Sequence, residues 1–102
     1  MTVRFQRRAE TTSPMSFAIA QEFADYISGK YPETVEVFME RFGALNAVYW
    51  ITDFPDVATL DARLSALAAD EGYQAIIVKA QEAAAFVTGS IQDTVLSTEP
   101  GG

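Results

Sequence analysis

The chain has 102 residues, of which 49% are hydrophobic, and it carries a formal net charge of −7. This length and composition suit one folded domain. No apolar run reaches the roughly 20 residues of a membrane span, and no secretory signal is recognisable, so we expect a cytoplasmic protein without a membrane partner. The negative charge repels phosphate backbones, so nucleic acid is not an expected partner.

Two residue types that carry much of protein chemistry are missing, because the chain contains no cysteine and no histidine. Their absence excludes disulfides, thiolate nucleophiles, zinc–sulfur sites and the serine–histidine pair. It also removes the commonest metal ligand and the usual base at neutral pH. We therefore expect neither a metal site nor a cofactor.

The first expected element is a strand over about residues 2–10, in which the side chains alternate with a period of two. One of its two faces carries Val3, Phe5, Arg7 and Ala9. The strand also contains a cluster of arginines, namely Arg4, Arg7 and Arg8. Such a cluster indicates either a local anion site or a solvated strand face.

A helix is expected next, over about residues 14–28. Ser13 can accept hydrogen bonds from the first amides of the helix, and Pro14 suits its first turn. The apolar stripe of this helix consists of Met15, Ile19, Phe23, Tyr26 and Ile27. Gly29 and Pro32 then predict where the helix ends.

Two runs of β-forming residues, 34–43 and 46–54, predict a hairpin. If the loop has four residues, the facing pairs include Met39 with Trp50, Glu36 with Asp53 and Glu40 with Tyr49. One face then carries Val35, Val37, Met39, Arg41, Val48, Trp50, Thr52 and Phe54. The other carries Glu36, Phe38, Glu40, Phe42, Ala47, Tyr49, Ile51 and Asp53. A loop one residue longer or shorter would move one strand's side chains to the opposite face.

The last part of the chain predicts two helical segments and a strand. A helix begins near Asp56, and a second begins near Asp70, with Gly72 indicating a bend between them. A final strand is expected over 90–98. Residues 1–98 then form one domain, and residues 99–102 form a disordered tail.

The order β-α-β-β-α(α)-β predicts an α+β, ferredoxin-like fold with an antiparallel sheet and helices on one face. Such helices cover only the first hairpin face. The second face still presents the apolar side chains of Phe38, Phe42, Tyr49 and Ile51. Because monomers seldom expose such a patch, we expect a second copy of the chain to cover it in a homodimer.

This pattern resembles the dimeric α+β barrel superfamily, which includes antibiotic-biosynthesis monooxygenases, NIPSNAP proteins and EthD-like proteins. The most similar segment runs from "VYWITDFPD" at Val48 through "DEGY" at Asp70 to "GSIQDTVL", which ends at Leu96. The resemblance implies two ferredoxin-like protomers packed sheet to sheet. The superfamily holds cofactor-free oxygenases, haem-degrading enzymes, cyclases and proteins of unknown role, so fold analogy alone implies no reaction.

The resemblance bears on the choice of chemistry. Members that use a histidine have no counterpart in a chain without one. The cofactor-free, quinone-forming oxygenases are similar in placing asparagine, tryptophan, tyrosine and arginine around an aromatic substrate. Residues of these types here are Asn46, Trp50, Tyr49 and Arg41. They match in type without a shared motif, so no catalytic residue is assigned.

The candidate ligand-binding residues are Trp50, Arg41 and Met39. Trp50 and Met39 would be walls of a pocket between the sheet and the helices, and Arg41 would polarise a ligand oxygen. Alternatively, Trp50 is ordinary core packing and Arg41 reaches solvent near the hairpin end.

Two further pairs of side chains are open to two interpretations each. The carboxylates of Glu36 and Asp53 indicate either a coupled acid–base pair or a solvated acidic edge. Glu40 beside Tyr49 indicates either a polarised phenol or a plain cross-strand hydrogen bond.

Two functions therefore remain open. The first is an enzyme acting on an aromatic or polyketide-like metabolite, for example a cofactor-independent monooxygenase. The second is a non-catalytic, homodimeric ligand-binding or accessory protein, which needs no acid, base or metal.

Overall fold

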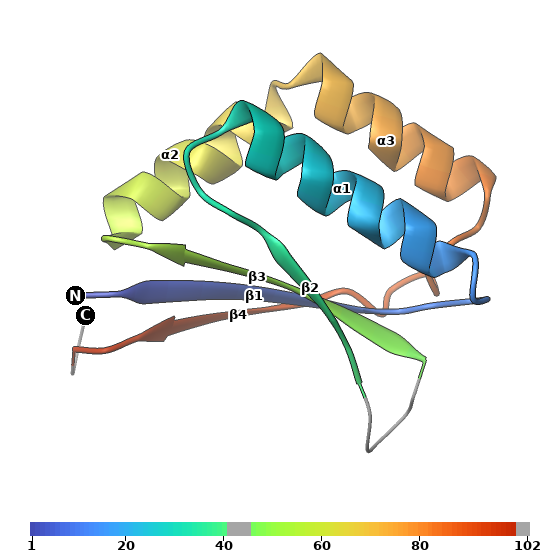
Figure 1. Ribbon diagram of the computed structural model, residues 1–102, viewed down its shortest axis with the longest axis horizontal. Helices are drawn as coiled ribbons and strands as arrows, with labels where there is room; N and C mark the ends of the chain where they lie inside the picture. Colours follow the sequence, from blue (N-terminus) through green and yellow to red (C-terminus); the bar gives the residue numbers. More distant parts are fainter. Residues whose placement is uncertain (41–45, 100–102) are drawn as a thin grey trace.

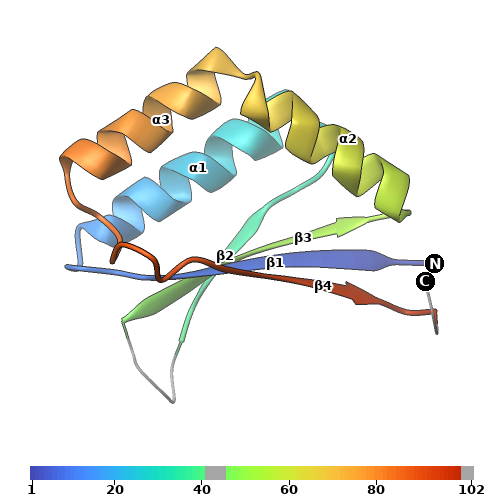
Figure 2. The same cartoon turned by 180° about the vertical axis from the view of Figure 1, so that it is seen from behind.

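The computed structural model describes residues 1–40 and 46–99. Its elements are β1 (Val3–Glu10), α1 (Ser16–Lys30), β2 (Glu36–Met39), β3 (Ala47–Phe54), α2 (Val57–Ala68), α3 (Glu71–Glu82) and β4 (Gln92–Ser97). The strands form an antiparallel sheet in the order β2-β3-β1-β4, and all three helices lie over one face of it (Figures 1 and 2). This is the predicted α+β, ferredoxin-like fold.

The helix starts were predicted with mixed success. Asp56 caps α2 by accepting a hydrogen bond from the Thr59 amide at 2.7 Å, and Asp70 caps α3 through the Tyr73 amide at 3.0 Å. Ser13 was expected to cap α1 with its side chain, which is wrong, because its backbone carbonyl accepts from the Ser16 amide instead. No helix within the described ranges is long and apolar enough to cross a membrane.

The hairpin pairs with a register two residues away from the predicted one. The observed pairs are Glu36 with Ile51, Val37 with Trp50, Phe38 with Tyr49 and Met39 with Val48. The predicted pairs of Met39 with Trp50 and Glu36 with Asp53 are therefore wrong. The Glu40 amide donates to the Ala47 carbonyl, which continues the observed register by one residue beyond Met39.

A two-residue shift leaves every described side chain on its predicted face, because strand side chains repeat with a period of two. The faces were thus predicted correctly for the described residues although the pairs were not. Arg41 and Phe42, and residues 100–102 of the predicted tail, lie outside the described residues.

The core lies between the sheet and the helices in two clusters. One packs Val3, Phe54 and Leu60 together, with Phe5 at its edge. The other is centred on Phe23, Ile76, Ala80 and Ala85, with Ile19, Tyr26, Trp50, Tyr73, Ile77 and Phe86 packed against it. Burying one large apolar side chain contributes about 1.5–3 kcal/mol, so these clusters stabilise the helix layer on the sheet.

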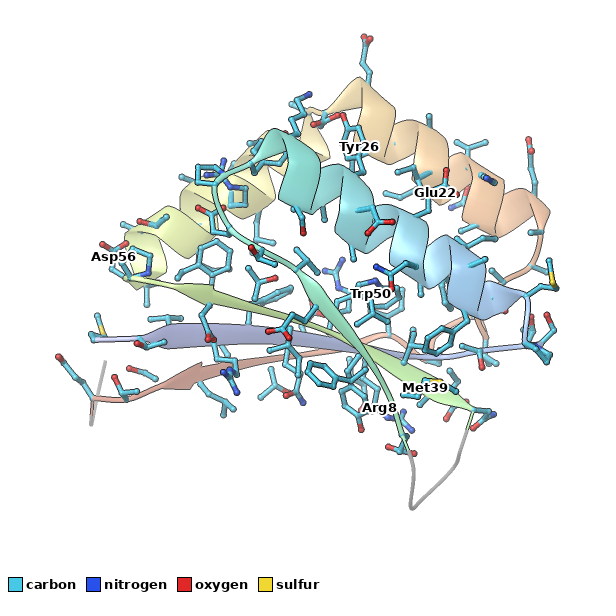
Figure 3. All side chains as sticks on the ribbon, viewed as in Figure 1. Arg8, Glu22, Tyr26, Met39, Trp50 and Asp56 are labelled. Atoms are coloured by element: carbon cyan, nitrogen blue, oxygen red, sulfur yellow. The ribbon has the colours of Figure 1, made fainter. Side chains whose placement is uncertain are left out.

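A buried carboxylate joins the start of α3 to the end of α1. Asp70 accepts hydrogen bonds from the hydroxyls of Tyr26 and Tyr31 and lies 2.9 Å from the Lys30 ammonium. These donors, the tyrosine hydroxyls first, hold the pKa of Asp70 well below its usual range. The Tyr26 ring also explains Gly72, because a Cβ there would lie 2.7 Å from its Cζ (Figure 3). Gly72 lies within α3, so close packing rather than the predicted bend requires it.

Candidate functional site

A cavity of about 770 Å³ lies between the helix layer and the sheet, within the range that binds drug-sized ligands. All three helices line it, together with β1, β3 and the segment before β4. Its apolar and aromatic lining includes Phe5, Phe23, Trp50, Phe54, Leu67, Ile77 and Phe86. The cavity is thus an aromatic-walled space built from residues far apart in the sequence.

Trp50 forms the centre of the aromatic wall. It points from β3 toward the helices, as predicted, and its indole N–H donates to the Ala20 carbonyl at 2.9 Å (Figure 3). Its ring meets those of Phe23 and Phe86 edge to face, with centroids 6.0 Å and 5.5 Å away. These edge-to-face contacts fix the orientation of the three rings relative to one another. Trp50 is therefore both core packing and a wall of the cavity, so the two interpretations of it coincide.

A charged side chain of the cavity lining is Arg7, which the sequence analysis placed in the arginine cluster as either part of a local anion site or part of a solvated strand face. Its guanidinium donates to both carboxylate oxygens of Asp93, with Nε–Oδ1 at 2.7 Å and Nη2–Oδ2 at 2.9 Å. This hydrogen bonding raises the pKa of Arg7, and the Tyr73 phenol acts in the same direction. On β1, Arg7 lies between Trp50 of β3 and Asp93 of β4.

A usable signal for Arg7 was present in the sequence. It shares the alternating set of Val3 and Ala9, both of which are fully buried. A charged residue in a core-facing set needs a partner or a ligand. The pattern predicts the face of Arg7, whereas the partner Asp93 comes from a strand 86 residues later and is visible only in the fold.

A second ion pair lines the same cavity near the start of β2. Arg63 of α2 donates to Glu33, with Nε–Oε1 at 2.5 Å, and lies over the Tyr31 ring at 4.6 Å. The hydrogen bond to Glu33 raises the pKa of Arg63. The cavity lining therefore includes two guanidiniums, those of Arg7 and Arg63, and the Glu33 carboxylate within a largely apolar surface, while the carboxylate bound to Arg7 comes from outside the lining.

Of the other two candidate ligand residues, Met39 is described by the structure and does not line this cavity. Met39 pairs with Val48, is about half exposed and lines a separate hollow of about 430 Å³ that also includes Asn46. Its expected place beside Trp50 depended on the four-residue loop. Arg41 lies outside the described residues, so ligand binding by Arg41 stays a prediction.

The predicted carboxylate pair of Glu36 and Asp53 does not form. Asp53 is bound by Arg4, with Nε–Oδ1 at 2.8 Å and Nη2–Oδ2 at 3.0 Å, and this hydrogen bonding lowers the pKa of Asp53. The coupled acid–base interpretation is therefore wrong. Within the described part of the chain, no three acidic side chains gather closely enough to hold a metal ion.

The predicted contact between Glu40 and Tyr49 is confirmed as a hydrogen bond, which the phenol donates at 2.7 Å. Arg8 lies 3.6 Å from Glu40 and 5.9 Å from the centroid of the Tyr49 ring. Arg8 points away from the helices, toward the opposite face of the sheet (Figure 3), and Glu40 and Tyr49 contact it there. This contact is therefore separate from the cavity.

The fold and the cavity define a ferredoxin-like α+β protein with a pocket of small-molecule size. The NIPSNAP family profile matches residues 4–98, and the chain belongs to this family. No curated protein matches the chain in sequence.

Solved structures share the fold. An uncharacterised NIPSNAP domain protein from Burkholderia xenovorans is 20% identical, with a TM-score of 0.74 over 100% of this chain and 98% of that one. A NIPSNAP family protein from Agrobacterium tumefaciens is 15% identical, with a TM-score of 0.69 over 99% and 96%. SnoaB, a cofactor-independent oxygenase from Streptomyces nogalater, is 15% identical, with a TM-score of 0.68 over 97% and 94%.

Proposed function

We propose that this protein is a homodimer that binds a flat, aromatic or polyketide-like molecule in the Trp50 cavity and oxygenates it without a cofactor. The observation that carries the proposal is the cavity of about 770 Å³ with an aromatic wall. Trp50, Phe23 and Phe86 interlock edge to face, so their ring surfaces form a stiff boundary. A flat ligand can contact such a wall over a large area without reordering it.

The oxygenase chemistry is supported by the shared fold with SnoaB, which is described as a cofactor-independent oxygenase. Such chemistry takes its electrons from the substrate. An anthrone-type carbon that loses a proton becomes an electron-rich anion, which can reduce O2. One oxygen atom then ends in the quinone and the other in water. The protein has to bind the substrate, favour its anion and exclude bulk water.

A second candidate is a ligand-binding or accessory protein without catalysis. It is favoured by the state of the two carboxylates that bind the guanidiniums of the cavity lining. Asp93 is engaged by Arg7, and Glu33 by Arg63, each through two hydrogen bonds. Neither is placed to take a proton from a ligand without breaking its ion pair.

Dimerisation is supported by the open face of the sheet, which none of the helices in residues 1–40 and 46–99 covers (Figure 2). Phe38 and Leu96 on this face are each about half exposed, and Tyr49 and Ile51 lie beside them on the strands. A two-fold axis lets one such patch cover another. The exposed apolar side chains of this face are consistent with a second copy as the partner.

The test uses the single tryptophan of the chain, which lies in the wall of the cavity. We expect anthrone and anthraquinone to quench Trp50 fluorescence with a saturable, one-site profile. We also expect anthrone, incubated with the protein, to consume O2 in an electrode assay. Saturable quenching without O2 uptake would select the accessory protein, and absence of saturable quenching would refute the proposal.

A matched pair of variants locates the binding. Ala80→Leu fills space at the cavity, whereas Ala83→Leu adds the same atoms at an exposed position that does not line it. We expect Ala80→Leu to weaken anthraquinone binding by about tenfold or more, from lost shape complementarity. Ala83→Leu should bind as the wild type does, and equal loss in both variants would place the ligand elsewhere. Circular dichroism checks that both variants fold.

A further inference from the structure

In the Arg7–Asp93 ion pair, the guanidinium is held on a central strand, whereas the carboxylate lies on an edge strand and can move away from the guanidinium. Arg7 lies on the central strand β1, with β3 on one side and β4 on the other, and its side chain is 32% exposed. Asp93 lies on β4, an edge strand whose residues are all exposed, and its side chain is 41% exposed. The side chain of Asp93 can therefore rotate away from Arg7 and place its carboxylate in solvent, while the guanidinium of Arg7 stays at the cavity.

The surroundings of Arg7 suit an aromatic ligand that carries an anion. Its guanidinium lies 5.5 Å from the centroid of the Phe5 ring, and Trp50 is its neighbour across the sheet. A guanidinium at an apolar wall requires a negative partner, and its planar fork fits a carboxylate with two parallel hydrogen bonds. In the structure, Asp93 accepts both of these hydrogen bonds.

We propose that Arg7 is the anion-binding residue of the cavity and that its ligands are planar aromatic carboxylates or phenolates, which replace Asp93 on the guanidinium. The inference rests on the proposed function only in that the cavity binds a flat aromatic molecule. One carboxylate exchanges for another anion, so the charge at Arg7 stays balanced. Asp93 is thus an internal competitor of the ligand.

Two other ion pairs in the chain show what makes this one exchangeable. Arg4 and Asp53 have the same two-point geometry, with Arg4 on the same strand as Arg7, but they lie on the open face, away from the cavity. Arg63 and Glu33 line the cavity, but the Glu33 side chain is only 11% exposed and has little access to water. Among the residues that the structure describes, only the pair of Arg7 with Asp93 combines a cavity guanidinium with a carboxylate on an exposed edge strand.

The experiment compares anthraquinone-2-carboxylate with its neutral carboxamide, both read by quenching of Trp50. In Arg7→Met we expect the carboxylate to bind about tenfold or more weakly, because a charged hydrogen-bonding partner is lost. The carboxamide should change by less than about twofold. In Asp93→Asn the carboxylate should bind about tenfold more tightly, because the competing anion is gone.

Matched variants on the open face separate this exchange from a general change of charge. Asp53→Asn and Arg4→Met alter the net charge by the same amounts and should leave both affinities within about twofold of the wild type. Equal effects of the two aspartate variants would overturn the proposal, and so would weaker binding of both probes to Asp93→Asn. If Arg7→Met fails to melt cooperatively, Arg7→Lys replaces it, since lysine keeps the charge and loses the fork.

The outcome also separates this inference from the proposed function. If the carboxamide binds and the carboxylate gains nothing from Asp93→Asn, the cavity binds aromatic molecules but Arg7 does not select anions. If neither probe binds the wild-type protein, both the proposed function and this inference fail.

Discussion

The two faces of the sheet carry similar side chains in different surroundings. On strand β1, Arg7 points toward the helices and Arg4 toward the open side. Each donates two hydrogen bonds to an aspartate of a neighbouring strand. Arg7 lies in the wall of an aromatic cavity, whereas Arg4 lies between the core-facing Val3 and Phe5 along β1 and so belongs to the opposite face of the sheet. Two ion pairs of the same geometry thus lie in different places, one at a candidate binding site and the other on an exposed surface.

The comparison extends to the apolar residues. On the helix side, Val3, Val48 and Phe54 are buried by the chain's own helices. On the open side, Phe38 and Leu96 are about half exposed. The difference lies in what covers each face, so the stability of the helix side is a property of one chain. Among the described residues, no helix covers the apolar side chains of the open side, so we expect a second copy of the chain to bury them.

The largest expected effect is on the helix-covered face. Phe23 is 9% exposed and packs against the rings of Trp50 and Tyr73. Phe23→Ala should lower the free energy of unfolding by about 3–5 kcal/mol, from lost burial and the cavity left behind. Urea unfolding at two protein concentrations checks this. The control is Val78→Ala, at an exposed residue of α3, which should lower the free energy of unfolding by less than about 1 kcal/mol. An equally small loss in Phe23→Ala would mean that Phe23 does not anchor the helix layer on the sheet.

The fold was predictable because period-two and helical patterns reflect burial directly, and burial of each element against one core decides the layers. The face of Trp50 followed from the same periodicity. The hairpin register did not, because the pattern of faces is unchanged by a two-residue shift, so Met39 was placed beside Trp50 in error.

The binding site was less predictable than the fold. Arg7 shows its face in the sequence, but Asp93 becomes its partner only through the order β3-β1-β4, which no local pattern contains. The reason for Gly72 is also visible only in the fold, because the ring of Tyr26, from another helix, occupies the space that a Cβ at this position would need. Residues that act through long-range contacts thus need the assembled structure, whereas residues that only have to be buried do not.

The next effect concerns the open face. We expect the wild-type chain to sediment as a dimer at micromolar concentration, because burial of apolar area at the open face can offset the entropy of association. Phe38→Glu combined with Ile51→Lys should weaken self-association by about 100-fold, which corresponds to roughly 2.7 kcal/mol. Val78→Glu, on the outer helix layer, should remain dimeric. A monomeric wild-type protein would remove the distinction between a self-covered face and a partner-covered face.

The smallest effect is expected at the exposed ion pair of Arg4 and Asp53. Both side chains are about half exposed, so water screens the pair, and Arg4→Gln should lower the Tm at pH 7 by at most about 4 °C. Because the hydrogen bond from Arg4 lowers the pKa of Asp53 in the folded state, the pair stabilises the protein above the unfolded carboxyl pKa of about 4. That contribution is lost as the pH falls through the lowered folded value. Thermal melts from pH 7 to pH 2 should therefore show the wild-type and Arg4→Gln proteins converging in acid. A Tm difference that stays constant down to pH 2 would mean that Arg4 stabilises the strand by packing of its methylene groups and not by its charge.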